Sequence, residues 1–427
     1  MIIAIIVFAV AMIIGVPVAF ALGLMGSVHV VSLGNPSYYL VIIQRLVDQV
    51  NMTSLTCLPF FILAGELMNG GGVTRRLLDF LRSLLGWLKG GLAYCTVVIA
   101  AILSAILGSP NGVASMLCGI LVPEMRKDGY KEEFTGSLVA ASSILGPIIP
   151  PSTSFIMYCM MTNCSIKALF MAGIVPGLAL VAVFCALIAY YGKKMGFKRD
   201  DNGFRWGAVG RSFIKALPAL IVPVVMMGGV VTGLFTATES GAVACLCALI
   251  AAAIYREMDW KKLPNMLLRA AVTGGGILLM ISFGGVIAWS MTRAGIPNQV
   301  IALVTSITNS KFLLTLLMII ILMIGGMFLD TGTLTMVFLP VMFPLATAIG
   351  MDIVHFGLIF SVMTIIGYIT PPVGVVLFVT SNASGIPFSK LCKTIWPFAI
   401  VSAIVTTLLA YLPDICLWIP RLTGYAG

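Results

Sequence analysis

The sequence predicts an all-α polytopic membrane protein made of two inverted repeats. Hydrophobic residues make up 60% of the 427 residues and charged residues only 9%, whereas a soluble protein carries about a quarter charged residues. Apolar stretches long enough to cross about 30 Å of hydrocarbon recur from one end of the chain to the other. Two further patterns predict how these segments are arranged: the grouping of the basic residues, and a repeated spacing of prolines and glycines.

The basic residues predict the orientation of the segments. Twenty of the 25 Lys and Arg residues fall into five clusters. Because Lys and Arg are enriched in cytoplasmic loops, we expect the clusters inside, the other five basic residues outside, and both termini outside. The net charge of +10 then reflects topology rather than nucleic-acid binding. The clusters are Arg75, Arg76, Arg82 and Lys89; Arg126, Lys127 and Lys131; Lys193, Lys194, Lys198, Arg199, Arg205, Arg211 and Lys215; Arg256, Lys261, Lys262 and Arg269; and Lys390 with Lys393.

Residues 1–191 form the first expected repeat. The segment 92–125 has basic sequence on both sides and "GSPNG" at its middle. A segment that begins and ends on one side cannot cross once, so a re-entrant hairpin is predicted here. The basic, amphipathic segment "VTRRLLDFLRSLLGWLK" before it is expected to lie along the inner interface. The crossing segments are expected at residues 1–15, 17–33, 53–70, 135–162 (which contains a proline break) and 166–191.

Residues 216–427 form the second expected repeat, after a cytoplasmic linker at 192–215. Its hairpin is expected at 312–350, entering from outside, with a break at "LDTGT". Each repeat has five crossings and one hairpin, and an odd number of crossings inverts the second repeat relative to the first. The crossing segments are expected at 216–233, 236–254, 271–291, 356–380 (with prolines at its centre) and 394–418.

Landmark residues at one spacing support the repeat. An internal repeat keeps its register along the chain. Five landmarks recur after 221 residues (371 − 150): Pro150-Pro151 and Pro371-Pro372, Gly146 and Gly367, Pro123 and Pro344, Pro176 and Pro397, and Ser109 and Asp330 at the hairpin tips.

The proline breaks "ILGPIIPPS" and "IIGYITPPV" indicate transport. Proline removes a backbone donor and breaks a helix, and irregular backbone is tolerated at membrane depth where it lines a polar cavity or is buried in protein. Freed carbonyls can coordinate a cation, and half-helix N-termini present amides to an anion. Two inverted repeats with such breaks and hairpins are typical of a secondary transporter. Proline kinks used only for packing are the alternative.

Other classes of function lack their motifs. The ten cysteines form no CxxC pair, His29 and His355 are far apart in sequence, and neither a Walker A nor a GxGxxG motif is present. An intramembrane enzyme needs a catalytic constellation, and a passive channel fits poorly with paired broken helices. We therefore expect no enzymatic activity.

Five motifs resemble one transporter family. "GSPNGVASM", "LGPIIPPSTSFIMY", "GLFTATESGAV", "GGMFLDTGTLTMVFLPV" and "IGYITPPVGVVLFV" are similar to the large membrane subunit of tripartite ATP-independent periplasmic (TRAP) transporters, and the similarity covers essentially the whole chain. The resemblance implies an elevator-type ion-transporter superfamily fold. It also implies import of an organic acid, of the sialic-acid type, across the bacterial inner membrane, with co-transport of two or more Na⁺ ions. Both termini then face the periplasm.

The resemblance also implies two partners. One is a small four-helix membrane subunit, expected as a separate chain, and the other is a soluble periplasmic substrate-binding protein. The alternative is a stand-alone sodium-coupled dicarboxylate or anion carrier of the same superfamily.

The hairpin tips and the proline breaks contain the candidate sodium ligands. We expect backbone carbonyls as the main ligands, completed by hydroxyls or the Asn111 amide. Capping of the hairpin helices is the alternative role for these side chains, and both roles can hold at once. The expected ligands are Ser109, Asn111, Gly146, Ile149 and Pro150 in the first repeat, and Gly332, Thr333, Gly367, Thr370 and Val373 in the second.

The substrate is expected between the two tips, at Ser109, Ser152, Thr153, Thr331 and Asp330. An ionisable group at membrane depth is a functional hypothesis by default, and Asp330 could neutralise sodium or cap a hairpin helix. Glu66 and Glu239 are lesser candidates. Because these motifs contain no Arg or Lys, we expect helix dipoles, backbone amides and sodium to hold an anion.

Overall fold

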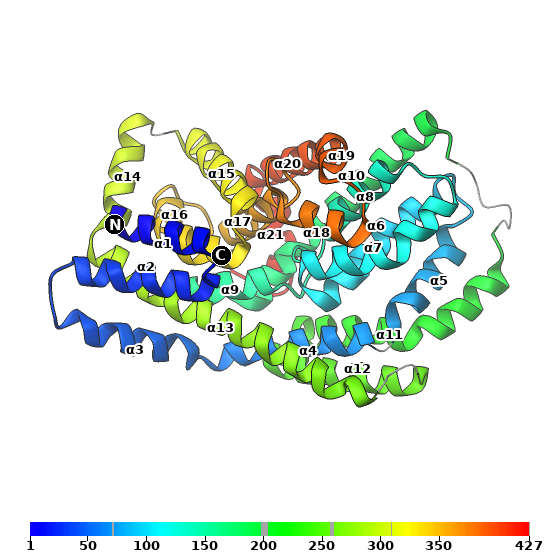
Figure 1. Cartoon of the computed structure of the whole chain (residues 1–427), viewed down its shortest axis with the longest axis horizontal. Coiled ribbons are helices and arrows are strands. Elements are labelled where there is room, and N and C mark those ends of the chain that lie inside the picture. The colour runs from blue at the N-terminus through cyan, green and yellow to red at the C-terminus, as the bar shows by residue number, and fades with distance from the viewer. Residues whose placement is uncertain (71, 198–203, 257–259, 309, 427) are drawn as a thin grey trace.

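The computed structural model describes residues 1–70, 72–197, 204–256, 260–308 and 310–426, and these residues form helices without any β-strand (Figure 1). The predicted all-α fold class is confirmed. The first half contains α1 (Ile2–Ile14), α2 (Val18–Ser32), α3 (Tyr38–Val50), α4 (Cys57–Gly70), α5 (Val73–Leu85), α6 (Gly91–Leu107), α7 (Pro110–Lys127), α8 (Glu132–Ser143), α9 (Thr153–Thr162) and α10 (Ile166–Met195). The second half contains α11 (Trp206–Thr232), α12 (Ala237–Tyr255), α13 (Leu263–Arg293), α14 (Ile296–Ile307), α15 (Lys311–Phe328), α16 (Thr331–Ala348), α17 (Ile353–Gly367), α18 (Val375–Ser384), α19 (Phe388–Thr394), α20 (Trp396–Ala410) and α21 (Pro413–Leu422).

The spacing of 221 residues recurs in the helix boundaries. α7 begins at Pro110 and α16 at Thr331 (331 − 110), and α8 begins at Glu132 and α17 at Ile353 (353 − 132). Both Pro-Pro peptide bonds at the two breaks are cis. The elements therefore follow the same order in both halves. The border between the repeats stays a prediction, because 198–203, which include Lys198 and Arg199 of the third basic cluster, lie outside the described residues.

Both predicted hairpins are present. α6 packs against α7, and α15 packs against α16. Gly108 turns the first hairpin with a φ of 57°, in the left-handed region that favours glycine. Ser109 and Asp330 then cap α7 and α16, because each side chain accepts a hydrogen bond from the backbone N–H three residues further on.

The prolines interrupt two helices at the centre of the molecule. Nine residues separate the end of α8 from the start of α9 (153 − 143 − 1), and seven separate α17 from α18 (375 − 367 − 1). All residues of α8 from Phe134 to Ser143 and of α17 from Val354 to Gly367 are buried. A helix buried on every side belongs to the protein interior, so the two breaks lie inside the molecule rather than against lipid.

Two groups of helices meet along the length of the molecule. α3, α4, α11, α12 and α13 form an elongated layer along the lower side of Figure 1, and the hairpins and broken helices form a compact body above it. α13 joins the two groups, since it packs against α2, α3 and α4 and also against α16. α4 makes the equivalent connection to α6.

The helix lengths confirm a multi-pass membrane protein. Among the described residues, six helices are long and apolar enough to cross a membrane, or seven if the bent pair α19 and α20 is one span. Shorter apolar helices, among them α1, α2, α4, α9, α17 and α18, accompany them. The ten predicted crossings stay a prediction, because the breaks divide several segments into shorter helices.

Three helices differ from the sequence-based expectation. α3 and α14 were not predicted: α3 has no buried residue and carries Arg45 and Asp48, which lower its hydropathy. The expected crossing at 394–418 is too long, because α20 ends at Ala410 and Pro413 starts the separate helix α21. Proline at the first position of a helix is favourable, since its missing N–H has no partner there in any case.

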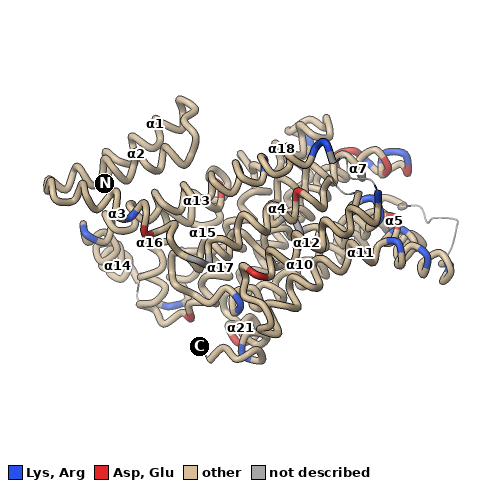
Figure 2. The backbone as a smooth tube through the Cα atoms, turned by 90° about the horizontal axis from the view of Figure 1, so that it is seen from below, with Lys and Arg blue, Asp and Glu red and all other residues tan. Residues whose placement is uncertain are grey.

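Basic residues gather around α5 and α7, at one end of the molecule (Figure 2). α5, predicted as an interfacial helix, packs against α6 and α11 at this end. The asymmetry agrees with the clusters in the sequence, while the side of the membrane that this end faces stays a prediction.

Candidate functional site

A polar cavity of about 360 Å³ lies where the two hairpin tips meet. Its walls come from both hairpins, from α9, and from α4 and α13 of the elongated layer. The lining residues are Ile62 and Glu66 of α4; Gly108 to Gly112 of the first tip; Thr153, Ser154 and Met157 of α9; Thr273, Ile277 and Met280 of α13; Asp330 to Gly332 of the second tip; and Tyr368 of the second break.

Three helix N-termini open into this cavity. The first residues of α7, α9 and α16, which are Pro110, Thr153 and Thr331, all line it. The N–H groups of a first helical turn have no partner within the helix, and the helix dipole places partial positive charge there. Converging N-termini therefore favour an anion. The substrate was expected between the two hairpin tips. The structure shows that the N-terminus of α9 lines the same cavity.

The first tip contains an unsatisfied oxygen. Ser109 accepts a hydrogen bond from the Gly112 N–H at 3.5 Å. Asn111 follows in the first turn of α7, and its Oδ1 atom is buried without a hydrogen-bond partner among the described residues. A buried carbonyl-type oxygen without a donor is costly unless another partner binds it, so this atom is available to a cation. Thr153 fastens the tip to the first break, because its Oγ1 donates to the Gly108 carbonyl at 3.2 Å.

The second tip is held by its own side chains. Asp330 accepts hydrogen bonds from the Thr333 N–H at 3.2 Å and from the Thr333 hydroxyl. The Thr331 hydroxyl lies 2.5 Å from the Tyr368 hydroxyl, which also accepts from the Thr331 N–H. Asp330 thus performs one of the two roles expected of it, the capping of a hairpin helix, and it also lines the cavity.

The first break approaches the first tip through a glycine. A Cβ atom added at Gly146 would lie 3.6 Å from the backbone of both Ser109 and Pro110, so the two segments are in contact. The carbonyls of Gly146, Ile149 and Pro150 accept no backbone hydrogen bond from the described residues. These carbonyls therefore have no described backbone donor, and their role as sodium ligands stays a prediction.

The second break contains a Pro-Pro pair like the first, but its contacts are different. Gly367 packs against Gly326 of α15, whose backbone would lie 2.5 Å from a Cβ at position 367. Thr370 donates from its hydroxyl to the Ile366 carbonyl at 2.9 Å. The Gly374 N–H donates to the Met327 carbonyl at 3.2 Å, which ties this break to its hairpin. Thr370 and Val373 keep backbone carbonyls without a described backbone donor.

The structure brings most of the predicted substrate residues together. Ser109, Thr153, Asp330 and Thr331 all line the cavity. Ser152 does not: it is fully buried, caps α9 by accepting from the Phe155 N–H at 3.3 Å, and donates to the Pro147 carbonyl at 2.5 Å. Its position as N-cap turns the hydroxyl toward the backbone of the break, so Ser152 supports the site rather than facing it.

The candidate sodium ligands form two separate groups. Ser109, Asn111 and Gly332 line the cavity, whereas Thr333 in the first turn of α16 and the ligands expected at the breaks are not among its lining residues. Ile149 packs its side chain against Gly177 of α10, which leaves only its carbonyl as a ligand. Thr333 is buried with its hydroxyl on Asp330. Gly332 contacts Met157 of α9 and Met280 of α13, so the tip touches both groups of helices.

Four polar lining residues were not predicted for the site. Thr273 gave no signal because it lies in an apolar run without a break, whereas Ser154 and Tyr368 lie beside and within the proline breaks but were not singled out there. Glu66 did carry a signal, as an acid within an apolar helix, and was given only a lesser role. Glu239, by contrast, forms a capping box with Thr236 at the exposed start of α12.

The charge of the cavity is negative at the side chains and positive at the helix ends. Glu66 and Asp330 are the charged side chains among its described lining residues, and no described Lys or Arg lines it. The two histidines take no part: His29 bonds to the Ser290 hydroxyl at 2.9 Å and His355 to the Leu409 carbonyl at 3.1 Å. An anion in the cavity must therefore be held by helix N-termini, with its negative charge kept away from both carboxylates.

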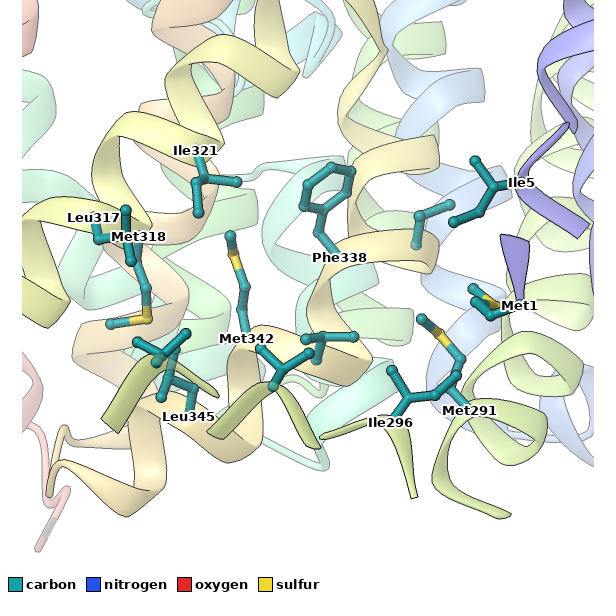
Figure 3. A pocket seen from close by; sticks show the side chains of 14 residues that line it. Met1, Ile5, Met291, Ile296, Leu317, Met318, Ile321, Phe338, Met342 and Leu345 are labelled. Carbon is teal, nitrogen blue, oxygen red and sulfur yellow. The ribbon is translucent and has the colours of Figure 1, made fainter. Parts of the chain in front are cut away.

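A second hollow has the opposite character. It measures about 310 Å³, lies between α1, α13, α14, α15 and α16, and is lined by apolar side chains such as Met291, Phe338 and Met342 (Figure 3). Such a lining offers no group to orient a polar ligand. The polar cavity at the tips is therefore the candidate site.

The fold and the cavity define a multi-pass secondary transporter, in which paired hairpins and broken helices enclose a polar site within an apolar protein. Residues 5–415 match the family described as "Tripartite ATP-independent periplasmic transporter, DctM component". The chain belongs to this family, whose members are transporter permeases. The predictions of the TRAP family and of a protein that is not an enzyme are confirmed.

Relatives and a solved structure agree with this assignment. The chain is 34% identical over 403 residues to the 2,3-diketo-L-gulonate TRAP transporter large permease protein YiaN of Escherichia coli, covering 94% of each chain. It is 32% identical over 413 residues to the sialic acid TRAP transporter large permease protein SiaM of Vibrio cholerae, covering 96% of each. Its fold is similar to that of the YdaH transporter of Alcanivorax borkumensis, with a TM-score of 0.62, 12% identity, and coverage of 89% of this chain and 90% of that one.

Proposed function

We propose that this chain is the translocating subunit of a sodium-coupled importer of a sugar acid, with sialic acid as the first substrate to test. One observation carries the proposal: three helix N-termini and several hydroxyls converge on a cavity that no described Lys or Arg lines. Such a cavity suits a ligand with one carboxylate and many hydroxyl groups. The protein would lie in the bacterial inner membrane with both termini in the periplasm.

The chemistry of the lining favours a sugar acid over a dicarboxylate. The carboxylate would lie at the N-termini of α7, α9 and α16, and the sugar hydroxyls would donate to Glu66 and Asp330. A dicarboxylate would place its second negative charge near these two side chains, and like charges repel. Sialic acid and 2,3-diketo-L-gulonate, the substrates in the names of the two relatives, are both sugar acids with a single carboxylate.

Sodium ions would bind where each tip meets its break. The first ion would use Ser109, Asn111 and the carbonyls of Gly146, Ile149 and Pro150; the unsatisfied Asn111 oxygen supports this assignment. The second would use Gly332, Thr333, Gly367, Thr370 and Val373, with the negative charge of Asp330 nearby. Oxygen atoms of this kind are the ligands that hard cations prefer. Two or more ions would be carried with each substrate.

An elevator mechanism fits the position of the cavity. The hairpins and broken helices would move as one body along α4 and α13, carrying the cavity with them. The wall contributed by α4 and α13 supports this, because Ile62, Ile277 and Met280 offer apolar surfaces that slide without breaking hydrogen bonds.

Two partners would complete the system, a separate four-helix membrane subunit and a periplasmic binding protein that delivers substrate. A helix N-terminus contributes up to about 2 kcal/mol, whereas micromolar binding requires about 8 kcal/mol. Even three termini fall short once the loss of the acid's hydration is included. Capture at low concentration would therefore depend on the binding protein.

The test is reconstitution in liposomes. The chain, the small subunit and the binding protein would be combined with radiolabelled sialic acid at low micromolar concentration, with or without an inward sodium gradient. We expect uptake only when the binding protein and the gradient are both present. Equal uptake without the binding protein would identify a stand-alone carrier, and equal uptake in potassium would disprove sodium coupling.

A further inference from the structure

A basic pocket lies between α5 and α11, at the end of the molecule where Lys and Arg gather (Figure 2). It measures about 380 Å³ and is lined by Arg76 and Asp79 of α5 and by Ala208, Arg211, Ser212 and Lys215 of α11. Three cationic side chains face one carboxylate, so the pocket has an excess of positive charge. Neither the substrate cavity nor the apolar hollow shares these residues.

Contacts between the two helices shape this pocket. Arg211 and Lys215 are four residues apart and therefore lie on one face of α11. The hydroxyls of Ser83 and Ser212 are 2.6 Å apart, and the rings of Phe80 and Phe213 lie 5.5 Å apart. These contacts hold α5 against α11 beside the pocket, so the cations are presented by a fixed surface.

Arg211 and Lys215 are available to an anion. Arg76 is held in place, because it donates to the Gly72 carbonyl at 3.1 Å and stacks 3.9 Å from the centre of the Tyr255 ring. Arg211 donates from Nε to the Gly207 carbonyl at 3.2 Å. Neither Arg211 nor Lys215 forms an ion pair with a described residue, whereas Arg82 on the same α5 is paired with Glu124 at 2.8 Å.

Apolar side chains continue from the pocket along α11. Trp206 is 80% exposed, Ile214 69% and Val224 67%. In a membrane protein, exposed aliphatic and tryptophan side chains contact lipid, with tryptophan preferring the headgroup level. An exposed tryptophan beside the pocket, followed by exposed aliphatic side chains, is the pattern expected where phosphate groups meet the acyl chains.

We propose that this pocket binds the phosphate headgroup of an anionic phospholipid whose acyl chains lie along α11. Basic pockets at the membrane surface bind acidic headgroups, and an Arg guanidinium can donate two hydrogen bonds to one phosphate. A free phosphate would use only the cations, whereas the lipid also covers the exposed apolar side chains of α11. Bound lipid would fasten α5 and α11, of which α11 belongs to the elongated layer, to the membrane surface.

Quenching of tryptophan fluorescence tests the proposal. The chain would be placed in phosphatidylcholine nanodiscs that contain increasing fractions of brominated phosphatidylglycerol or, separately, brominated phosphatidylcholine. The signal of Trp206 is the difference between the unchanged protein and Trp206→Phe. We expect phosphatidylglycerol to quench this signal at a lower mole fraction than phosphatidylcholine does.

Matched variants identify the residues. At about 1 kcal/mol for each cation, Arg211→Gln with Lys215→Gln should raise the phosphatidylglycerol fraction for half-quenching by up to about 30-fold, toward the phosphatidylcholine value. Arg211→Lys with Lys215→Arg should keep the preference, because the charge is retained. Lys127→Gln with Lys131→Gln, which removes two exposed cations outside the pocket, should also keep it.

Three results would overturn the assignment. First, phosphatidylglycerol and phosphatidylcholine could quench the unchanged protein equally. Second, Arg211→Gln with Lys215→Gln could shift half-quenching no more than Lys127→Gln with Lys131→Gln does. Loss of the preference in excess inorganic phosphate, but not in sodium chloride of the same ionic strength, would indicate a free-anion site instead of a lipid site.

Discussion

At the residue scale, the cavity depends on oxygens that the backbone leaves unpaired. Asn111 supplies a buried amide oxygen without a described donor. Five carbonyls of the breaks accept no described backbone hydrogen bond: those of Gly146, Ile149, Pro150, Thr370 and Val373. A soluble protein would satisfy such groups with water, but water is scarce within a membrane protein. In the proposed function, a dehydrated sodium ion would pair with several of these oxygens at once.

Asn111→Ala and Thr370→Ala should raise the sodium concentration for half-maximal uptake by about fivefold, because each removes one oxygen worth about 1 kcal/mol. Sodium titration of uptake by the reconstituted system measures the shift. Thr370→Ser should restore the unchanged value, and Asn298→Ala, at an exposed position of α14, should have no effect. Titrations that superimpose on the unchanged protein would remove both side chains from the proposed sodium sites.

Glu66→Gln should alter substrate preference. The neutral amide keeps the size of the side chain but removes one of the two negative charges that line the cavity. Succinate should then inhibit sialic acid uptake several-fold more strongly than in the unchanged protein, because repulsion of its second carboxylate is reduced. Competition assays measure this. Glu239→Gln serves as the control, since Glu239 caps α12 outside the cavity, and equal inhibition in all three proteins would contradict the role of Glu66.

At the scale of elements, glycines allow the second hairpin to touch the second broken helix. A Cβ at Gly326 would lie 2.2 Å from the Thr364 carbonyl oxygen, and one at Gly367 would lie 2.5 Å from the Gly326 backbone. α15 and α17 therefore pack backbone to backbone. Small residues permit this close approach of helices in membranes, where packing rather than exclusion of water drives association.

Gly326→Ala should destabilise the protein by about 1–3 kcal/mol, the usual effect of overpacking. Thermal unfolding of the purified protein in detergent measures the change as a lower midpoint. Gly275→Ala in α13 is the matched control, because an added Cβ there meets no atom within 4 Å. A midpoint for Gly326→Ala as high as that of the control would show that α15 and α17 can separate without cost.

At the scale of the whole molecule, the basic residues and the first hairpin lie toward the same end. The basic residues gather at the end that carries α5 and α7 (Figure 2), and α6 and α7 enter the molecule from that end in Figure 1. From the positive-inside rule we predict that this end faces the cytoplasm. On the same prediction, the hairpin formed by α15 and α16 would enter from the periplasm.

Alkaline phosphatase fused after the C-terminus should be active, because this enzyme works only in the periplasm. Green fluorescent protein fused at the same position should be dark when exported unfolded. Paired fusions in the loop between α7 and α8, next to Lys127 and Lys131, provide the internal control and should give the reverse result. A fluorescent C-terminal fusion would place that terminus in the cytoplasm and contradict the predicted orientation.

The sequence by itself determined the features that depend on local chemistry. Proline cannot donate a backbone hydrogen bond, so Pro150-Pro151 and Pro371-Pro372 mark the breaks wherever the helices pack. The hairpin tips follow from "GSPNG" and "LDTGT", and their capping residues Ser109 and Asp330 lie where the spacing of 221 residues predicts them. The all-α class and the family follow from the same motifs.

Only the tertiary structure decided which distant groups share the cavity. Glu66 and Thr273 meet the hairpin tips from α4 and α13, and Ser152 turns away because it caps α9. No local sequence pattern predicts these contacts, because they depend on how helices far apart in sequence pack against one another. Capping, by contrast, is a contact between residues three apart, so Ser109 and Asp330 could be found from the chain alone while Glu66 required its neighbours.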